Sequence, residues 1–266
     1  MTQPRFKWHS KDYAGHSSAQ FEWALELIEK LHLDGHESLL DMGCGDGKVT
    51  AQIASFLSQG RATGMDSSES MIVLASKTFP RLKHQNLCFV IMDALYPGFQ
   101  QNFDVIFSNA ALHWVSDHPA MLKGVGQCLK PGGRILFQMG GQGNAADILD
   151  LLDDLMVSEK WKSYFKGFSF SYGFYGPDDY EKWLPKAGLK PERLELIPKD
   201  MTQSGKQGLE GWIRTTWLPY IQQVPDHLRE DFISEVAETY IRKHPLDADG
   251  NVHVKMVRLE LAAGKY

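Results

Sequence analysis

The chain has 266 residues, of which 43% are hydrophobic and 23% are charged, and its formal net charge is -5. This composition is typical of globular proteins and excludes a disordered, collagenous or fibrous chain. No run approaches the roughly 18 consecutive apolar residues of a membrane helix, and the polar residues 1–5 do not resemble a signal peptide, so we expect a cytoplasmic protein.

The charge and the cysteine content limit the kinds of ligand and partner that the protein is expected to bind. The sequence pI is near 6.1 and no cluster of five or more Lys and Arg occurs, which argues against nucleic acid and anionic membranes. The three cysteines, Cys44, Cys88 and Cys128, form no CxxC pair, which argues against a disulfide framework and a zinc site. We therefore expect a small-molecule substrate, no metal, and a monomer or small homo-oligomer.

Strand and helix patterns alternate through the first half of the chain. After an arm of sixteen residues, residues 17–33 predict an amphipathic helix with a capping box between Ser17 and Gln20. The alternation that follows predicts a parallel sheet with helices on both faces. Strands are expected at 38–42, 61–66, 87–92, 103–108 and 134–139, and helices at 48–57, 69–79 and 119–129, with a turn at 130–133.

The alternation stops after residue 139. Asn144 is expected to cap a helix that runs to about residue 160, and an aromatic, glycine-rich segment follows over 161–175. Further helices are predicted at 177–187, 208–220 and 225–243, and strands at 193–197 and 252–261. We interpret the helices as a cap inserted into a sheet domain, and the two late strands as an edge pair that completes the sheet.

A glycine-rich loop at residues 41–47, Asp-Met-Gly-Cys-Gly-Asp-Gly, ends the first strand and opens a helix. Glycines there allow the backbone to approach a ligand closely, and the N–H groups at the helix start favour a negatively charged one. The dinucleotide spacing Gly-x-Gly-x-x-Gly fails at Lys48, and a Walker A pattern fails at Met42 and Val49. A glycine turn that binds no ligand is the remaining structural alternative.

Polar residues also end the later strands, at the edge where open α/β sheets bind ligands. Asp66 can accept both hydroxyls of a ribose, or it can cap the helix together with the serines that follow it. Asp93 can accept a hydrogen bond from an adenine amino group, or it can be a solvated loop residue. The backbone carbonyl of Asn109 can meet a ligand ammonium group.

Together these features resemble a class I S-adenosylmethionine-dependent methyltransferase. The resemblance rests on the 41–47 loop, Asp66, Asp93 and the Leu-Lys-Pro-Gly-Gly turn at 129–133. It implies a doubly wound, seven-stranded, mostly parallel Rossmann-like α/β sheet with a helical cap, and S-adenosyl-L-methionine as the cofactor. The expected organisation is an N-terminal arm and helix (1–34), a cofactor-binding core (35–142), cap helices and insertion (143–188 and 201–250), and C-terminal edge strands (189–200 and 251–266).

A finer resemblance concerns the reaction. Residues 107–114, together with Trp8, Tyr13 and Gln20, are similar to the trans-aconitate methyltransferases, which methylate a small polycarboxylate to a methyl ester. The run 112–115, Gln20 and the segment 159–161 also resemble juvenile hormone acid methyltransferase. The malonyl-acyl-carrier-protein methyltransferase of biotin synthesis is a third similar enzyme. The resemblance therefore implies methylation of the carboxylate of a small organic acid. A more apolar acid, or a non-catalytic module that binds S-adenosylmethionine, are the alternatives.

Methylation of a carboxylate requires few catalytic groups from the protein. A carboxylate, with a pKa of about 4, is ionised at neutral pH and needs no general base. Proximity and orientation can supply roughly 7 to 11 kcal/mol of barrier reduction. A hydroxyl acceptor would need a base, for which His113 is the candidate. The acid needs a clamp of uncharged donors or an arginine.

The candidate residues fall into two groups. Those expected to bind the cofactor are Tyr13, Gln20, Asp41, Gly43, Cys44, Gly45, Asp66, Ser67, Met71, Asp93, Ala94 and Asn109. Those expected to bind the substrate are Tyr13, His113, Trp114, Arg214 and Trp217. Each has a structural alternative: His113 can pack beside Trp114, Gln20 can be a capping residue only, and Arg214 can lie on a solvated helix face. The aromatic residues of 161–175 are expected mainly as core; if they line the pocket, a fatty or isoprenoid acid is favoured.

Overall fold

The computed structural model of the protein describes residues 18–170 and 172–266. They divide into two compact units. The sheet unit is built from residues 18–142, 172–197 and 258–266, and the inserted unit from 143–170 and 198–257. Residues 172–188 were expected with the inserted helices, but in the structure this segment belongs to the sheet unit, because Tyr180 and Leu184 pack into the core of the sheet.

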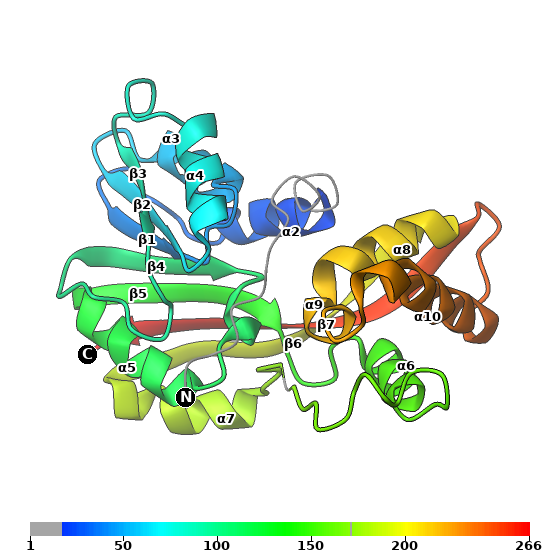
Figure 1. Ribbon diagram of the computed structural model, residues 1–266. Helices are drawn as coiled ribbons and strands as arrows, with labels where there is room; N and C mark the ends of the chain where they lie inside the picture. The colour runs from blue at the N-terminus through cyan, green and yellow to red at the C-terminus, as the bar shows by residue number, and fades with distance from the viewer. Residues whose placement is uncertain (1–17, 171) are drawn as a thin grey trace. The chain divides into compact units, whose positions relative to one another are not determined.

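Seven strands form one sheet (Figure 1). They are β1 (Ser38–Met42), β2 (Arg61–Asp66), β3 (Leu87–Ile91), β4 (Phe103–Asn109), β5 (Leu129–Gly140), β6 (Leu189–Ser204) and β7 (Asn251–Lys265). Their order is β3-β2-β1-β4-β5-β7-β6. Pairing is parallel from β3 through β5, whereas β7 runs antiparallel to β5. The prediction of a seven-stranded, mostly parallel α/β sheet is therefore confirmed.

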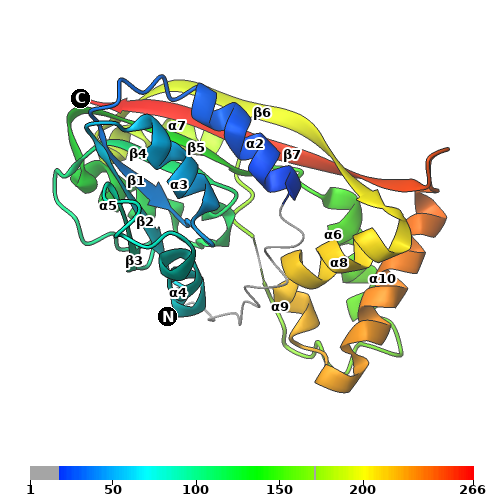
Figure 2. The same ribbon diagram turned by 90° about the horizontal axis from the view of Figure 1, so that it is seen from above.

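Helices lie between the strands along the chain. They are α2 (Ser18–Glu29), α3 (Lys48–Phe56), α4 (Glu69–Thr78), α5 (His118–Cys128), α6 (Ala146–Met156), α7 (Pro177–Trp183), α8 (Gly205–Thr216), α9 (Leu218–Ile221) and α10 (Arg229–Lys243), with 3-10 turns at Leu112–Trp114, Pro185–Ala187 and Asp226–Leu228. Figure 1 shows α5 and α7 on one side of the sheet, and Figure 2 shows α2 and α3 on the other. None of the helices within the described residues is long and apolar enough to cross a membrane.

The core of the sheet unit has two halves, one on each face. In β1 every residue is buried: Leu39 faces the cluster formed with α2 and α3, and Leu40 faces the cluster formed with α5 and α7. This pattern is expected for central parallel strands, whose two faces are both covered and whose successive side chains point to opposite faces. It explains why the short apolar runs in the sequence were sufficient to locate these strands.

Three local features differ from the sequence prediction. The expected turn at 130–133 is a bulge within β5, since Leu129 pairs with Phe103 but the next pair joins Arg134 to Val105. The strands β6 and β7 are longer than predicted, at 16 and 15 residues. Asn144 does not cap a helix: α6 begins after Ala145, and the Asn144 Oδ1 instead accepts a hydrogen bond from the backbone N–H of Val257 at 3.0 Å.

The inserted unit has an aromatic core of its own. The Trp161 ring lies 5.1 Å from the ring of Phe232 on α10, and Phe165 lies 5.6 Å from the same ring. Trp212 and Trp217 meet edge to face at 5.8 Å. These contacts favour the structural interpretation of Trp161 and Phe165, because both side chains are almost fully buried against α10.

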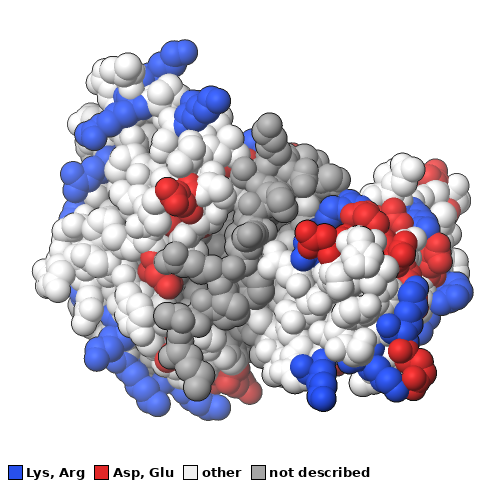
Figure 3. Space-filling view, viewed as in Figure 1, with Lys and Arg blue, Asp and Glu red and all other residues white. Residues whose placement is uncertain are grey.

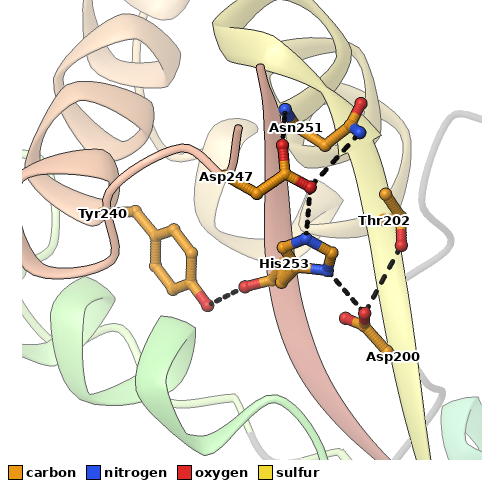
Figure 4. Close-up of polar contacts among 6 residues, drawn as sticks. All are labelled: Asp200, Thr202, Tyr240, Asp247, Asn251 and His253. Carbon is orange, nitrogen blue, oxygen red and sulfur yellow. Dashed lines mark hydrogen bonds and ion pairs between the residues drawn. The ribbon is translucent and has the colours of Figure 1, made fainter. Parts of the chain in front are cut away.

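A charged cluster joins the β6 and β7 segments of the inserted unit (Figure 4). The His253 ring lies between two carboxylates, with Nδ1 at 2.5 Å from Asp200 and Nε2 at 2.9 Å from Asp247. These hydrogen bonds, that with Asp247 first, raise the pKa of His253. The pKa of Asp247 is lowered to about 2, first by the backbone N–H of Asn251 and next by His253. The cluster therefore favours a protonated imidazole.

On one face of the molecule, charged side chains of both signs are present. On the face that Figure 3 shows, Lys and Arg lie in several separate groups, and in the inserted unit Asp and Glu lie among them. Lys206 on α8, for example, lies 2.6 Å from Glu238 on α10.

Candidate functional site

The loop between β1 and α3 is held in a conformation that requires glycine. Gly43, Gly45 and Gly47 all have positive φ angles, of 79°, 52° and 80°. The N–H groups of Gly43 and Cys44 both donate to the carbonyl of Met65, at 2.8 and 3.0 Å, which fastens the loop to the end of β2. A Cβ on Gly43 would lie 2.2 Å from the Cβ of Ala111, so the backbone of the loop packs directly against the segment after β4.

Asp66, the last residue of β2, holds this loop. One carboxylate oxygen accepts from the N–H of Gly45 at 3.0 Å and the other from the N–H of Ser68 at 2.8 Å. Burial raises the pKa of Asp66, against the lowering effect of these two N–H groups. The cap of α4 is Ser68, whose hydroxyl accepts from the N–H of Met71 at 3.4 Å. Since each carboxylate oxygen has two lone pairs, Asp66 can also accept from a ligand hydroxyl.

Asp41 supports the loop from the core. Its side chain is 2% exposed and accepts a hydrogen bond from the Thr50 hydroxyl in α3 at 2.6 Å. Burial, with a contribution from the nearby Asp66 carboxylate, raises the pKa of Asp41 to about 7. This position links β1 to the first turn of α3 rather than presenting the carboxylate at the surface.

The remaining cofactor candidates differ in exposure. Asp93 is exposed after β3, and one of its oxygens accepts from the N–H of Leu95 at 2.9 Å. Met71 is buried, Ser67 is exposed and Ala94 is half-buried. The Cys44 thiol is buried, and burial followed by the charges of Asp41 and Asp66 raises its pKa, so it is a protonated thiol and a poor nucleophile. In residues 18–170 and 172–266, no three His, Cys, Asp or Glu side chains are arranged to hold a metal ion.

Strand register places these residues along one edge of the sheet. On β2, Asp66 pairs with Ile91 of β3, two residues before Asp93. Asn109 is the last residue of β4 and pairs with Gln138 of β5. The carboxyl ends of the parallel strands β3, β2, β1 and β4 thus carry Asp93, Asp66, the 43–47 loop and Asn109 in that spatial order. This is the edge at which open α/β sheets bind ligands.

The turn after β4 buries a histidine. His113 is 9% exposed, and its ring centroid lies 5.6 to 6.2 Å from those of Trp114, Tyr172 and Phe174. Its Nδ1 has no hydrogen-bond partner among the residues that the structure describes. Burial, and then the charge of Arg258, lower the pKa of His113 to about 3, so the imidazole is neutral at pH 7.

A second histidine, His118, positions this turn. Its Nε2 lies 3.1 Å from the carbonyl of Leu112, and its Nδ1 lies 2.5 Å from the hydroxyl of Tyr180 on α7. Burial lowers the pKa of His118 to about 4, so the ring is neutral, donating from Nε2–H to the Leu112 carbonyl and accepting from Tyr180. His118 was not predicted from the sequence as a site residue, because nothing in the pattern around the start of α5 indicates a buried histidine.

Arg258 on β7 was also missed. It lies opposite Gly140 on β5, is 4% exposed, and its guanidinium lies 4.5 Å from the ring centre of Trp23 on α2. The signal that could have identified it is a break in the alternation of β7. Residues 252, 254 and 256 are buried, then 258–261 are all buried, so a charged side chain enters the buried set.

The other substrate candidates have structural contacts. Arg214 on α8 donates to Glu230 at 2.9 and 2.5 Å, which supports its alternative as a surface ion-pair residue of the inserted unit. Trp217 is 1% exposed within the aromatic core of that unit. Trp114 is half-buried beside His113. Tyr13 and the side chain of Gln20 lie outside the described residues, so their roles stay predictions.

Comparisons with known proteins consistently match methyltransferases. A family model described as a methyltransferase domain matches residues 39–133. The chain is 26% identical over 269 residues to an uncharacterized methyltransferase, C70.08c, of Schizosaccharomyces pombe, covering 98% of this chain and 99% of that protein. It is 26% identical over 261 residues to a trans-aconitate 2-methyltransferase of Enterobacter sp., covering 96% and 97%.

Solved structures share the fold. A putative methyltransferase from Bacillus halodurans superposes with a TM-score of 0.62 at 18% identity, covering 91% of this chain and 98% of that one. The phosphoethanolamine N-methyltransferase 2 of Haemonchus contortus, solved in complex with S-adenosyl-L-methionine, has a TM-score of 0.60 at 20% identity and covers 96% of this chain and 56% of that one.

Proposed function

Because this chain belongs to the class I S-adenosylmethionine-dependent methyltransferases, we propose that it transfers the methyl group of S-adenosyl-L-methionine to the carboxylate of a small organic acid. The product is a methyl ester. In this displacement a carboxylate oxygen forms the new bond to the methyl carbon while the bond from that carbon to sulfur breaks, and no proton has to move.

The residues at the carboxyl edge fit this cofactor, which when bound supplies an electrophilic methyl group on a sulfonium. The left-handed glycines of the 43–47 loop allow close backbone approach. Asp66 has lone pairs left for the ribose hydroxyls, and Asp93 is exposed where the adenine amino group is expected. The carbonyl of Asn109 is the expected acceptor for the ammonium group.

The observation that carries the choice of acceptor is the environment of His113. A general base works best when its pKa lies near the operating pH, and a pKa of about 3 makes the imidazole a weak base. Asp41 has a suitable pKa, but its side chain is buried and bonded to Thr50. A hydroxyl or ammonium acceptor would have to lose a proton, whereas a carboxylate is ionised already. The site therefore favours an acid, and the trans-aconitate 2-methyltransferases among the relatives support a small, polar one.

The direct test is a screen with radiolabelled methyl donor. The purified protein is incubated with di- and tricarboxylates, fatty acids and isoprenoid acids, and with hydroxyl and amine acceptors as comparison. We expect label that is released as volatile methanol in base, since esters are base-labile. Label that resists base would show an ether or N-methyl product and contradict the proposal. Calorimetric binding of S-adenosylmethionine without transfer to any acceptor would indicate a non-catalytic binding module.

A second test separates the acids from acceptors that need a base. We expect the His113→Asn variant to keep its turnover of the identified acid within about tenfold, because orientation rather than proton transfer drives the reaction. Removing a true general base costs about 10²- to 10⁴-fold, and a loss of that size would contradict the proposal. His36→Asn, which changes an exposed histidine of the same unit, is the matched control.

A further inference from the structure

Gln138 on β5 has a buried side-chain amide whose orientation is fixed. The side chain is 2% exposed, and its Nε2 donates a hydrogen bond to Oε2 of Glu260 on β7 at 3.1 Å. The reverse orientation would place two acceptors, the amide oxygen and the Glu260 carboxylate, against each other, so the amide nitrogen has to face Glu260. The amide oxygen, on the other side of the same carbon, therefore faces away from Glu260.

Glu260 is itself held in place by charged neighbours. Its side chain is fully buried, accepts hydrogen bonds from Lys30 on α2 at 2.9 and 3.0 Å, and forms an ion pair with Arg193 on β6. Two cations and one carboxylate give this cluster a net positive charge. The cluster therefore fixes the Gln138 amide and also disfavours a further cation next to it.

The oxygen of the same amide has no partner within the protein. Oε1 of Gln138 accepts no hydrogen bond from the residues that the structure describes. Buried polar atoms are almost always hydrogen-bonded, and an unsatisfied buried acceptor loses the hydrogen bonds that water gave it in the unfolded chain. An unsatisfied acceptor beside a ligand-binding edge therefore indicates a donor that arrives with the ligand.

Strand order places Gln138 beside the position expected for the acceptor acid. Gln138 pairs with Asn109, the last residue of β4. The residues expected to bind adenine, ribose and the ammonium group end β3, β2 and β4, so the methionine end of the cofactor is expected next to β5. The acid has to reach the methyl group at that end, and it is therefore expected over β4 and β5.

The chemistry of the amide oxygen limits which group of the acid can meet it. The carboxylate that accepts the methyl group is ionised and has no proton to donate, and the same holds for any further carboxylate. An ammonium group could donate, but Lys30 and Arg193 disfavour a cation here. A neutral donor remains, and in a small polar acid this is a hydroxyl.

We propose that Gln138 determines the substrate specificity of the enzyme by accepting a hydrogen bond from a hydroxyl of the substrate, which is therefore a small hydroxy acid. This inference rests on the proposed function. The hydroxyl keeps its proton throughout the transfer, because the new bond forms at the carboxylate oxygen. A carboxylate in the place of the hydroxyl would face the Gln138 oxygen with lone pairs only and would be selected against.

The test compares acids that differ only in the hydroxyl. Each protein is titrated by calorimetry, in the presence of S-adenosylhomocysteine, with β-hydroxybutyrate and butyrate, malate and succinate, and citrate and tricarballylate. Any other acid that the screen identifies is tested beside its hydroxy or deoxy counterpart. Gln138→Met removes the acceptor and keeps an unbranched side chain of similar length. Gln127→Met, which changes an exposed glutamine of α5 in the same unit, is the matched control.

We expect the wild type to bind the hydroxy acid of its preferred pair about 5- to 150-fold more tightly than the deoxy acid, because the deoxy acid leaves a buried acceptor unsatisfied. Gln138→Met should reduce this preference to within about threefold, and it should bind the deoxy acid at least as tightly as the wild type does. Gln127→Met should keep the wild-type preference. Affinity for S-adenosylhomocysteine serves as the folding control.

A wild-type protein that methylates an acid but binds its hydroxy and deoxy forms equally would overturn the inference and leave the proposed function intact. This comparison needs no variant, so it decides the question even where Gln138→Met does not fold. Equal weakening of both acids in Gln138→Met would show that the residue only supports the structure and would also overturn the inference. A wild-type protein that binds the cofactor but methylates no acid would overturn both proposals.

Discussion

Replacing Gly43 by alanine tests whether the cofactor loop is held by the contact that its backbone makes with the segment after β4. The new Cβ would lie 2.2 Å from the Cβ of Ala111. Both atoms belong to short side chains that cannot rotate away, so one backbone segment has to move. The same substitution also places an alanine at a φ of 79°, in the left-handed region.

A matched control separates the free-energy cost of the steric contact from that of the left-handed backbone. Gly132, in the β5 bulge, has a φ of 73°, and a Cβ there would meet nothing within 4 Å. Gly132→Ala should therefore show the backbone cost alone, about 1 to 2 kcal/mol. Gly43→Ala should add an overpacking cost of about 1 to 3 kcal/mol, for a total of roughly 2 to 5 kcal/mol. For units of this size, 1 kcal/mol lowers Tm by about 2 to 4 °C.

Thermal unfolding and calorimetric titration with S-adenosylmethionine provide the readouts. We expect Tm to fall by roughly 2 to 8 °C in Gly132→Ala with unchanged cofactor affinity, and by a larger amount in Gly43→Ala with affinity reduced at least about tenfold. If Gly43→Ala unfolds at the same temperature as Gly132→Ala, or binds the cofactor as well as the wild type, the close packing of the loop does not have the role that we assign to it.

Three further predictions concern other polar contacts. Asp66→Asn should lower cofactor affinity about 10- to 100-fold, because the amide keeps only one of the two acceptor oxygens. Calorimetric titration measures this affinity, and an unchanged value would contradict the prediction. The raised pKa of His253 means that its contribution to stability is fully present below the unfolded pKa of about 6.5 and is lost as pH rises through the raised folded value. His253→Gln should therefore abolish a fall in Tm between pH 6 and 9, and an identical pH profile in both proteins would refute this. Tyr180→Phe leaves the buried Nδ1 of His118 without its partner and should cost about 1 to 3 kcal/mol in urea unfolding, whereas a neutral effect would show that another group takes the hydrogen bond.

The central strands and the cofactor loop were predictable because their determinants are local. Ser38–Met42 and Arg61–Asp66 were located to the residue, since each is a short run bounded by turn-forming residues and covered on both faces. The glycine spacing of the 43–47 loop and the position of Asp66 after a strand could be interpreted in the same way. In these segments propensity, pattern and tertiary environment agree.

The sheet edge beyond β5 was harder to predict from the sequence, because the conformation and burial of its residues depend on partners that are distant in the chain. Most of β6 is at least partly exposed, so its apolar pattern is weak and only residues 193–197 were recognised. Asn144 has the residue type of a helix cap, but its side chain bonds to Val257, more than 100 residues away. Arg258 and His118 are buried polar residues whose burial follows from packing that no local period encodes.

The position of β7 also has a consequence for synthesis of the chain. Residues 258–264 pair with 134–140 and separate β5 from β6, so β5 has an open edge until residues 258–264 have left the ribosome. At about 5 to 20 residues per second, the roughly 120 intervening residues take about 6 to 24 s to translate. An unpaired edge strand is a template for association with other chains. During that interval β5 can pair with another chain, and a ribosome that stalls before residue 258 holds a chain in which β5 has no β7 to pair with.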